Sequence, residues 1–246
     1  MHAPTAAELL SVWESGLRQG PIDRALGVLE AVYPEQSADT LSGLSIGERD
    51  ARLFRVREIC FGPRIICTMR CPRCAGRLEW ESEVAELCVH EGTSLSAEFA
   101  VEAEDYRLRF RLPSSRDLAA VCENGDGKGD RRQRLLRRCL IGATTPEGGP
   151  VQMEQLPETA LQAMVREMER ADPQSNLHIR LACPACGHRW QALFDIVSFL
   201  WAEINHWAER TLRAVHVLAG AYGWREADIL AMSPTRRQMY LEMASR

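Results

Sequence analysis

Two Cys-Pro-x-Cys turns constrain the fold of this chain more than any other feature of its 246 residues. The first turn is Cys71-Pro72-Arg73-Cys74, and the second is Cys183-Pro184-Ala185-Cys186. Two residues between cysteines let one tight turn direct both thiolates at a single metal ion, and two such turns complete a tetrahedral site of four sulfurs. The spacing therefore predicts one metal site, formed by Cys71, Cys74, Cys183 and Cys186.

The segments around each turn predict a pair of β-strands. Short apolar runs precede the turns at 65–69 and 177–181, and segments that contain an aromatic residue follow them at 78–80 and 189–194. A strand, a cysteine turn and a second strand, given twice, is the layout of a zinc ribbon. Gly76 and Gly187 come just after the turns, where the chain must fold back beneath the sulfurs, often with a positive φ.

The two turns are far apart in the sequence, with 108 residues (75–182) between Cys74 and Cys183. A shared metal would therefore act as a long-range clip within one chain. The predicted fold class is α+β: a four-cysteine zinc ribbon with a long α/β insertion between its two knuckles, flanked by N- and C-terminal helices. The expected parts are an N-terminal helical segment (1–45), the zinc ribbon (46–80 with 177–196), the insertion (81–176) and a C-terminal helical unit (197–246).

Zinc is the expected metal. Iron in a rubredoxin-like site is chemically possible with four thiolates, but nothing in the sequence indicates electron transfer. Disulfides are disfavoured because the first ten residues do not resemble a signal peptide and the cysteine count, nine, is odd. His188 could compete as a ligand or bond to a sulfur, although a solvated strand residue is the simpler interpretation. Cys67 could face the metal, but a strand position is again simpler.

Residue periodicity predicts helices on both sides of the ribbon. Ser45 with Glu48 forms a capping box at the start of one helix, which Gly62-Pro63 ends. Apolar residues every three or four positions from Val197 to Tyr222 predict an amphipathic helix of about seven turns. The other expected elements are helices within 5–31, at 113–121, 131–140, 157–170, 226–231 and 235–243, strands at 98–101 and 106–112, and loops at 33–42 and 143–149.

Composition and motifs argue against several function classes. The formal net charge is −4 and the pI near 5.9, so the whole molecule is not attracted to nucleic acid. No apolar run is long enough to cross a bilayer, which predicts a cytoplasmic protein that does not bind membranes. The sequence has no GxSxG, HExxH or phosphate-binding loop, and a closed four-thiolate site cannot activate water. We therefore expect no catalytic residues and no enzyme activity.

Two further groups of residues are candidates for binding. The run 131–138 is rich in arginine, and Arg131, Arg134 and Arg138 are its candidate nucleic-acid contacts, although no interleaved aromatic residues support base stacking. Such a run is more often a solvated helix face. On the C-terminal helices, Trp201, Trp224 and Tyr240 are candidate anchors for a protein partner.

Several segments together resemble a known family. They are residues 44–51, 61–63, 71–74, 110–118, 183–188 and 222–230, followed by Arg236-Arg237 and Tyr240-Leu241. The chain resembles the zinc-ribbon baseplate-type proteins of contractile phage tails and phage-tail-like injection systems, distantly related to the baseplate hub assembly family. The resemblance implies a non-enzymatic structural or assembly component that contacts other baseplate or tail proteins and is incorporated into a tail-like particle. The alternative is a zinc-ribbon nucleic-acid-binding or transcription-associated protein.

Overall fold

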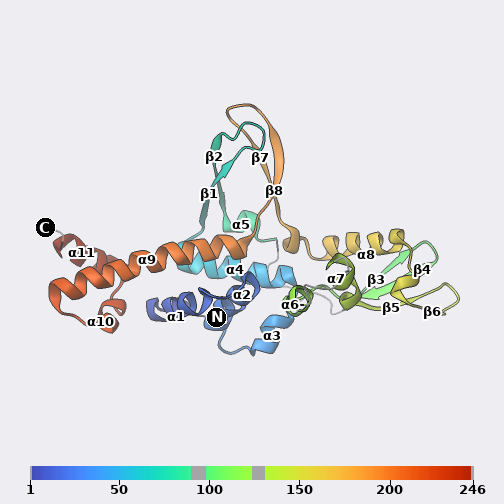
Figure 1. Cartoon of the computed structure of the whole chain (residues 1–246), viewed down its shortest axis with the longest axis horizontal. Coiled ribbons are helices and arrows are strands. Elements are labelled where there is room, and N and C mark those ends of the chain that lie inside the picture. The colour runs from blue at the N-terminus through green and yellow to red at the C-terminus, as the bar shows by residue number, and fades with distance from the viewer. Residues whose placement is uncertain (1, 90–97, 124–130, 245–246) are drawn as a thin grey trace. The chain divides into compact units, whose positions relative to one another are not determined.

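The computed structural model describes residues 2–89, 98–123 and 131–244. The chain divides into two compact units (Figure 1): unit 1 comprises Met1–Ser37 and Asp195–Arg246, and unit 2 comprises Ala38–Phe194. Helices are combined with small antiparallel sheets, which agrees with the predicted α+β class.

Unit 1 is helical. Its elements are α1 (Ala6–Gly16), α2 (Pro21–Val32), α9 (Ile196–Tyr222), α10 (Glu226–Leu230) and α11 (Pro234–Ala244). The long helix α9 begins where the Asp195 carboxylate accepts hydrogen bonds from the N–H groups of Val197 and Ser198, and it ends at Gly223. The long amphipathic helix is thus confirmed, as are the two short helices after it. Within the described residues, no helix combines the length and apolar character needed to cross a membrane.

The two short helices α10 and α11 pack onto the C-terminal part of α9. Val215, Leu218 and Ile229 form their shared buried cluster. The guanidinium of Arg237 is itself buried and donates hydrogen bonds to the carbonyl oxygens of Ile229, Leu230 and Met232. These carbonyls lie at or just after the end of α10, where no N–H group of the helix is available to them. Arg237 supplies the missing hydrogen-bond donors.

The helices at the start of unit 2 are α3 (Ala38–Gly43) and α4 (Ile46–Phe61). The predicted capping box is confirmed: Ser45 Oγ accepts from the N–H of Glu48, whose carboxylate accepts from the N–H of Ser45. The predicted end of α4 at Gly62 is also confirmed. The prediction of a loop over 33–42 is wrong in its second half, because α3 forms there.

Two β-hairpins carry the cysteine turns. β1 (Arg64–Arg70) pairs with β2 (Arg77–Glu83), and β7 (His178–Ala182) pairs with β8 (Arg189–Leu193), both antiparallel. The hairpins lie side by side (Figure 1). Alternate side chains of each strand are buried or half-buried, so one face of each hairpin is shielded from solvent. The buried residues include Ile65, Leu78, Ile179 and Leu181.

An aromatic cluster anchors the hairpins at the ends opposite their cysteine turns. Phe194 follows β8 and stacks on Phe54 of α4, with ring centroids 5.8 Å apart. Its ring also lies 6.0 Å from that of Trp80 on β2. Phe54 and Phe194 are both buried, so the hairpins are fixed to α4 at the ends opposite their cysteine turns.

A separate four-stranded sheet forms within the predicted insertion. Its strands, in order, are β3 (Phe99–Ala103), β4 (Tyr106–Phe110), β5 (Leu140–Thr144) and β6 (Pro150–Val151). The helices α7 (Arg131–Cys139) and α8 (Glu158–Ala171) pack against it around Leu108, Phe110 and Met164. The remaining short elements are α5 (Val84–Leu87), α6 (Ser115–Glu123), η1 (Met153–Gln155) and η2 (Pro173–Asn176).

β5 and β6 were not predicted. The sequence from Arg131 to Leu140 has a helical pattern, and the structure ends that helix one residue earlier, at Cys139. β5 then takes its conformation from pairing with β4, and the register shifts between Arg109 and Phe110. The extended conformation of this segment depends on pairing with a strand that is distant in the sequence, and the local pattern of apolar residues does not predict such pairing.

The N-terminus of α4 is held by a carboxylate from a distant segment. The N–H of Gly47 donates to Asp172 Oδ2 at 2.9 Å, and Asp172 is only 1% exposed. A Cβ at position 47 would lie 1.6 Å from Asp172 Oδ1. The close approach of Asp172 to the helix end therefore requires glycine at this position. The dipole of α4 attracts a negatively charged side chain placed there.

We expect Gly47→Ala to lower the free energy of unfolding by about 2 kcal/mol, because the added methyl group displaces a buried carboxylate. Gly27→Ala in α2 is the matched control, since a Cβ at position 27 would have no neighbouring atom within 4 Å and alanine favours the helix by about 0.5–1 kcal/mol. Urea denaturation of both variants measures the difference. A Gly47→Ala protein as stable as the parent would contradict the close approach.

Candidate metal centre

The four predicted cysteines come together at the ends of the two hairpins. Their sulfurs all lie within 4.8 Å of one another. The Sγ atoms of Cys71 and Cys186 are 3.7 Å apart, and those of Cys74 and Cys183 are 3.6 Å apart. These distances far exceed a disulfide bond of about 2.05 Å. Each short distance joins one turn to the other, so the cluster links the hairpins.

The spacing of the sulfurs fits a tetrahedral metal ion. Zinc–sulfur bonds are about 2.3 Å long, which places two sulfurs of a regular tetrahedron about 3.8 Å apart. The two measured cross-hairpin distances lie close to that value. Cys71 and Cys183 are buried, whereas Cys186 is half-buried and Cys74 is exposed. The four thiols could therefore hold one metal ion near the surface.

The two turns have the same backbone hydrogen bonds. The N–H of Cys71 donates to the carbonyl of Gly76, and the N–H of Cys183 donates to that of His188. A second, shorter-range bond is also repeated. The N–H of Ala75 donates to the carbonyl of Cys71, and the N–H of Gly187 donates to the carbonyl of Cys183. The turns are therefore two copies of one backbone conformation, aimed at a common point.

One position differs between the copies. Gly187 has the expected positive φ of 68°, but Gly76 does not; its neighbour Ala75 has a φ of 58° instead. Ala75 and Gly187 occupy the same position, four residues after the first cysteine of each turn. This offset could have predicted from the sequence that Ala75, and not Gly76, takes the positive φ. Gly76 has another role, because a Cβ there would lie 3.2 Å from the sulfur of Cys74.

Backbone N–H groups and neighbouring sulfurs set the acidity of the thiols. The N–H of Gly76 favours the thiolate of Cys74. The sulfurs of Cys186 and Cys183 outweigh it and raise the pKa of Cys74 to about 12. The N–H groups of Cys186 and Ala185 outweigh burial and lower the pKa of Cys183 to about 7. A cation among the sulfurs is what would let all four ionise at neutral pH.

His188 and Cys67, the two alternative ligands suggested by the sequence, have other neighbours. The ring of His188 stacks on that of Trp190, with centroids 5.7 Å apart. Cys67 lies on β1 opposite Trp80. Among the residues that the structure describes, neither belongs to the group of possible metal ligands.

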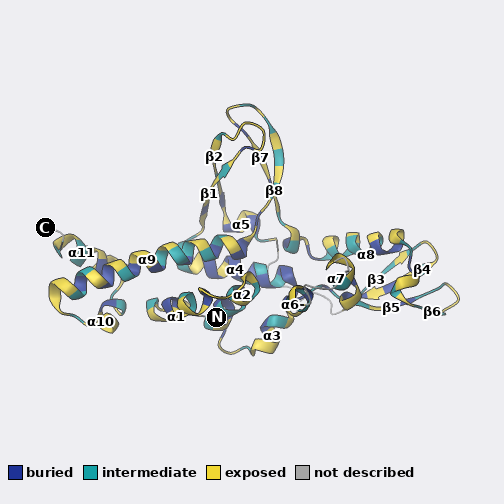
Figure 2. Cartoon of the chain, viewed as in Figure 1, coloured by how far each residue is buried: buried dark blue, intermediate teal, exposed yellow. Residues whose placement is uncertain are grey.

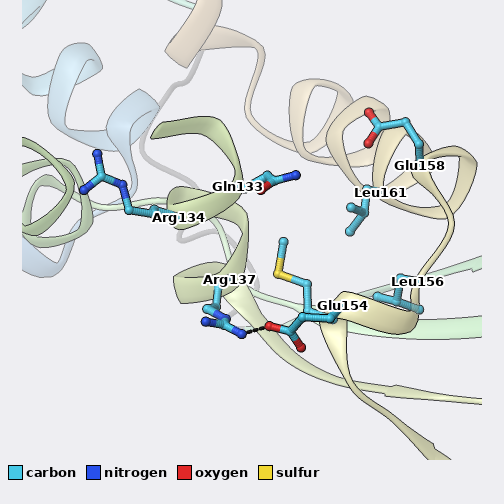
Figure 3. A pocket seen from close by; sticks show the side chains of 8 residues that line it. Gln133, Arg134, Arg137, Glu154, Leu156, Glu158 and Leu161 are labelled. Carbon is cyan, nitrogen blue, oxygen red and sulfur yellow. Dashed lines mark ion pairs between the residues drawn. The ribbon is translucent and has the colours of Figure 1, made fainter. Parts of the chain in front are cut away.

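The arginine-rich run 131–138 lies on α7, and three of its arginines pair with carboxylates. Arg132 pairs with Glu158, and Arg137 pairs with Glu154. A groove of about 530 Å³ lies between α7, η1 and α8, and Arg134 is part of its lining. Figure 3 shows the guanidinium of Arg137 directed at the carboxylate of Glu154 across this groove. Acidic and basic groups share its walls, which does not suit a polyanion.

Arg138, a second candidate of this group, pairs with a buried carboxylate. Its Nε donates to Asp117 Oδ1 at 2.9 Å, and Arg111 pairs with the same carboxylate. Burial would raise the pKa of Asp117, but hydrogen bonds from Arg111 and Ser114 outweigh it and hold the pKa well below its usual range. Arg131, the third candidate, is exposed at the start of α7.

The predicted partner anchors fall in two places within unit 1. Trp201 lies against Gly16, and the guanidinium of Arg24 covers its ring at 4.5 Å. Trp224 and Tyr240 instead form an aromatic cluster with Tyr222, whose role the sequence did not reveal. The ring centroids are 4.5 Å apart for Tyr222 and Trp224 and 4.8 Å apart for Trp224 and Tyr240. Tyr222 is 38% exposed.

The chain matches a model of a known protein family. A family model described as "T4 bacteriophage base plate protein" matches residues 22–201, which is more than half of the chain. The matched range contains all four clustered cysteines but not Tyr222, Trp224 or Tyr240. Neither the curated proteins nor the solved structures gave a match.

We expect Ala75→Gly and Gly187→Ala to change stability in opposite directions. The first removes a side chain from a left-handed position and should raise the free energy of unfolding by about 0.5 kcal/mol, whereas the second introduces that strain and should cost about 1 kcal/mol. Neither position is crowded enough for packing to intervene, since Ala75 is exposed and no atom lies within 4 Å of a Cβ at 187. Denaturant unfolding measures both, and changes of the same sign would contradict the equivalence of the turns.

Proposed function

The chain belongs to the T4 bacteriophage base plate protein family, and we propose that it is a structural component of a phage-tail-like baseplate, acting through protein–protein contacts on a zinc-stabilised scaffold. The family match carries the structural role, and membership implies a non-enzymatic protein that interacts with other tail proteins. We further propose that the chain is made in the cytoplasm and incorporated into the particle.

The scaffold is a zinc ribbon formed by the two hairpins. Support comes from the four sulfurs within 4.8 Å, the matching turns and the short cross-hairpin distances. Zinc suits this donor set because it favours tetrahedral thiolate ligands and has no redox chemistry to control. Four sulfurs leave no coordination position for water or substrate, so the metal has a structural role. The ribbon's proposed extent is 46–80 with 177–196, and the insertion between is 81–176.

The partner surface is the aromatic cluster of Tyr222, Trp224 and Tyr240. Tyrosine and tryptophan are enriched among residues that dominate binding energy in protein interfaces. Exposed methionines of α11, Met239 and Met243, add apolar area. Figure 2 shows α11 as largely exposed. Because the packing of Trp201 against Gly16 and Arg24 already accounts for its position, the proposal for partner contacts rests on the cluster.

Replacing one cysteine of the cluster tests the scaffold. We expect Cys71→Ser to reduce zinc from one equivalent per chain to well below that, and to lower the melting temperature by several degrees, because metal binding is coupled to folding. Cys122→Ser is the matched control, since Cys122 is exposed on α6 and outside the cluster. Elemental analysis and thermal melting provide the readouts. Full zinc content in the Cys71→Ser protein would contradict the site.

Replacing Tyr222 tests the partner surface without removing core packing. We expect Tyr222→Ser to reduce co-purification with the tail proteins of the same particle by about tenfold, because exposed interface tyrosines often contribute more than 1 kcal/mol. Zinc content should stay at the parental value, and the melting temperature should fall by only a few degrees, because the ring of Tyr222 is partly exposed but stacks on that of Trp224. Leu17→Ser serves as the control for loss of an exposed apolar side chain outside this surface, since Leu17 is 50% exposed and follows α1. Unchanged recovery of the tail proteins with Tyr222→Ser would show that the surface lies elsewhere.

A further inference from the structure

The ends of the two hairpins carry a concentrated positive charge. We define the hairpin tip as residues 69–78 and 180–191, which end at the register pairs Met69–Leu78 and Arg180–Gln191 and include the four clustered cysteines. The tip contains five arginines and no aspartate or glutamate, in a chain whose formal net charge is −4. The arginines are Arg70, Arg73, Arg77, Arg180 and Arg189, and all are exposed.

These arginines are not used to hold the fold together. Across residues 2–89, 98–123 and 131–244, no ion pair includes any of the five. Arg70 donates to the carbonyl of Ala75, and Arg77 donates to the hydroxyl of Thr68, both at a long 3.4 Å. The arginines of α7 differ, since three of them pair with carboxylates. The tip arginines therefore remain available to an external anion.

Two of the tip arginines face each other across the first hairpin, which lowers its stability. Arg70 and Arg77 are direct cross-strand partners in the last register position of the first hairpin. Like charges placed directly opposite on a two-stranded sheet destabilise it. The equivalent position of the second hairpin pairs Arg189 with Ala182 and avoids this repulsion. A local conflict of this kind is expected at functional sites.

The proposed metal does not neutralise the tip. Four thiolates with one divalent cation carry two negative charges, fewer than the five positive charges of the guanidinium groups around them. The same metal would hold the two turns together and so fix the arginines of both hairpins in one array. A rigid array loses less conformational entropy when it binds than separate side chains on two mobile hairpins.

We propose that the hairpin tip docks onto an acidic surface of another tail protein, with its arginines pairing with carboxylates. This inference rests on the proposed function, since it assigns a second contact surface to the same zinc-stabilised scaffold. Guanidinium groups bind carboxylates through two parallel hydrogen bonds, which gives such contacts direction as well as charge. A nucleic acid fits less well, because single strands are bound by stacking on exposed aromatic rings. Trp190, the one tryptophan of the tip, is half-buried and stacked on His188.

Charge reversal at the tip tests the proposal in the zinc-loaded full chain. The probe is a fluorescent polyglutamate peptide of about 20 residues, and a DNA duplex of similar total charge is the comparison. We expect Arg73→Glu/Arg189→Glu to weaken peptide binding by at least about tenfold. Arg18→Glu/Arg166→Glu makes the same change in net charge at exposed arginines outside the tip and should alter binding less than twofold.

Three results would overturn the proposal. The first is an equal loss of peptide affinity in both double variants. The second is binding of the DNA duplex as tight as binding of the peptide. The third is self-association of the parent that only the tip variant abolishes, which would identify a second copy of the chain as the occupant. Zinc content is measured on every sample. A parent that holds one zinc yet binds no peptide disproves the tip surface alone, whereas a parent without zinc disproves the scaffold.

Discussion

The convergence of four sulfurs within 4.8 Å is the constraint on which the two hairpins of unit 2 depend. Ionised sulfurs at such distances repel one another, so the arrangement is stable only with protons or a cation among them. Hydrogen bonds to the sulfurs of Cys186 and Cys183 favour the protonated thiol of Cys74 and raise its pKa to about 12. A divalent metal would remove the repulsion between thiolates and would also close a loop of more than 100 residues. Restricting an unfolded chain over that length is worth on the order of 4–5 kcal/mol.

The hairpins need this link because they bury little by themselves. An isolated two-stranded hairpin is marginally stable in water. At one end, the rings of Phe54, Phe194 and Trp80 join the hairpins to α4. At the other end, the cysteines join β1–β2 to β7–β8. The insertion between them has its own core around Phe110 and Met164, so its folding does not have to hold the ribbon closed.

Sequence reasoning was most successful where chemistry or local hydrogen bonding determines structure. The spacing of the cysteines predicted which four sulfurs meet, and the capping residues Ser45 and Glu48 predicted where α4 begins. β5 was missed because it forms by pairing with β4, from which it is separated by about thirty residues. The Asp172–Gly47 contact was missed for the same reason, since it joins segments 125 residues apart. The contact of Tyr240 with Tyr222 and Trp224 depends on the packing of α11 against α9, which periodicity within either helix does not reveal. Ala75 was the exception, because its equivalence to Gly187 was readable from the cysteine offsets.

X-ray absorption at the zinc edge, on protein purified under reducing conditions, tests the central claim most directly. The account predicts one zinc per chain with four sulfur neighbours at about 2.3 Å and no lighter atom in the first coordination shell. A shell that contains oxygen or nitrogen would contradict the closed four-cysteine site. Iron instead of zinc would contradict the choice of metal. Absence of any metal would contradict the claim that a metal ion joins the two hairpins.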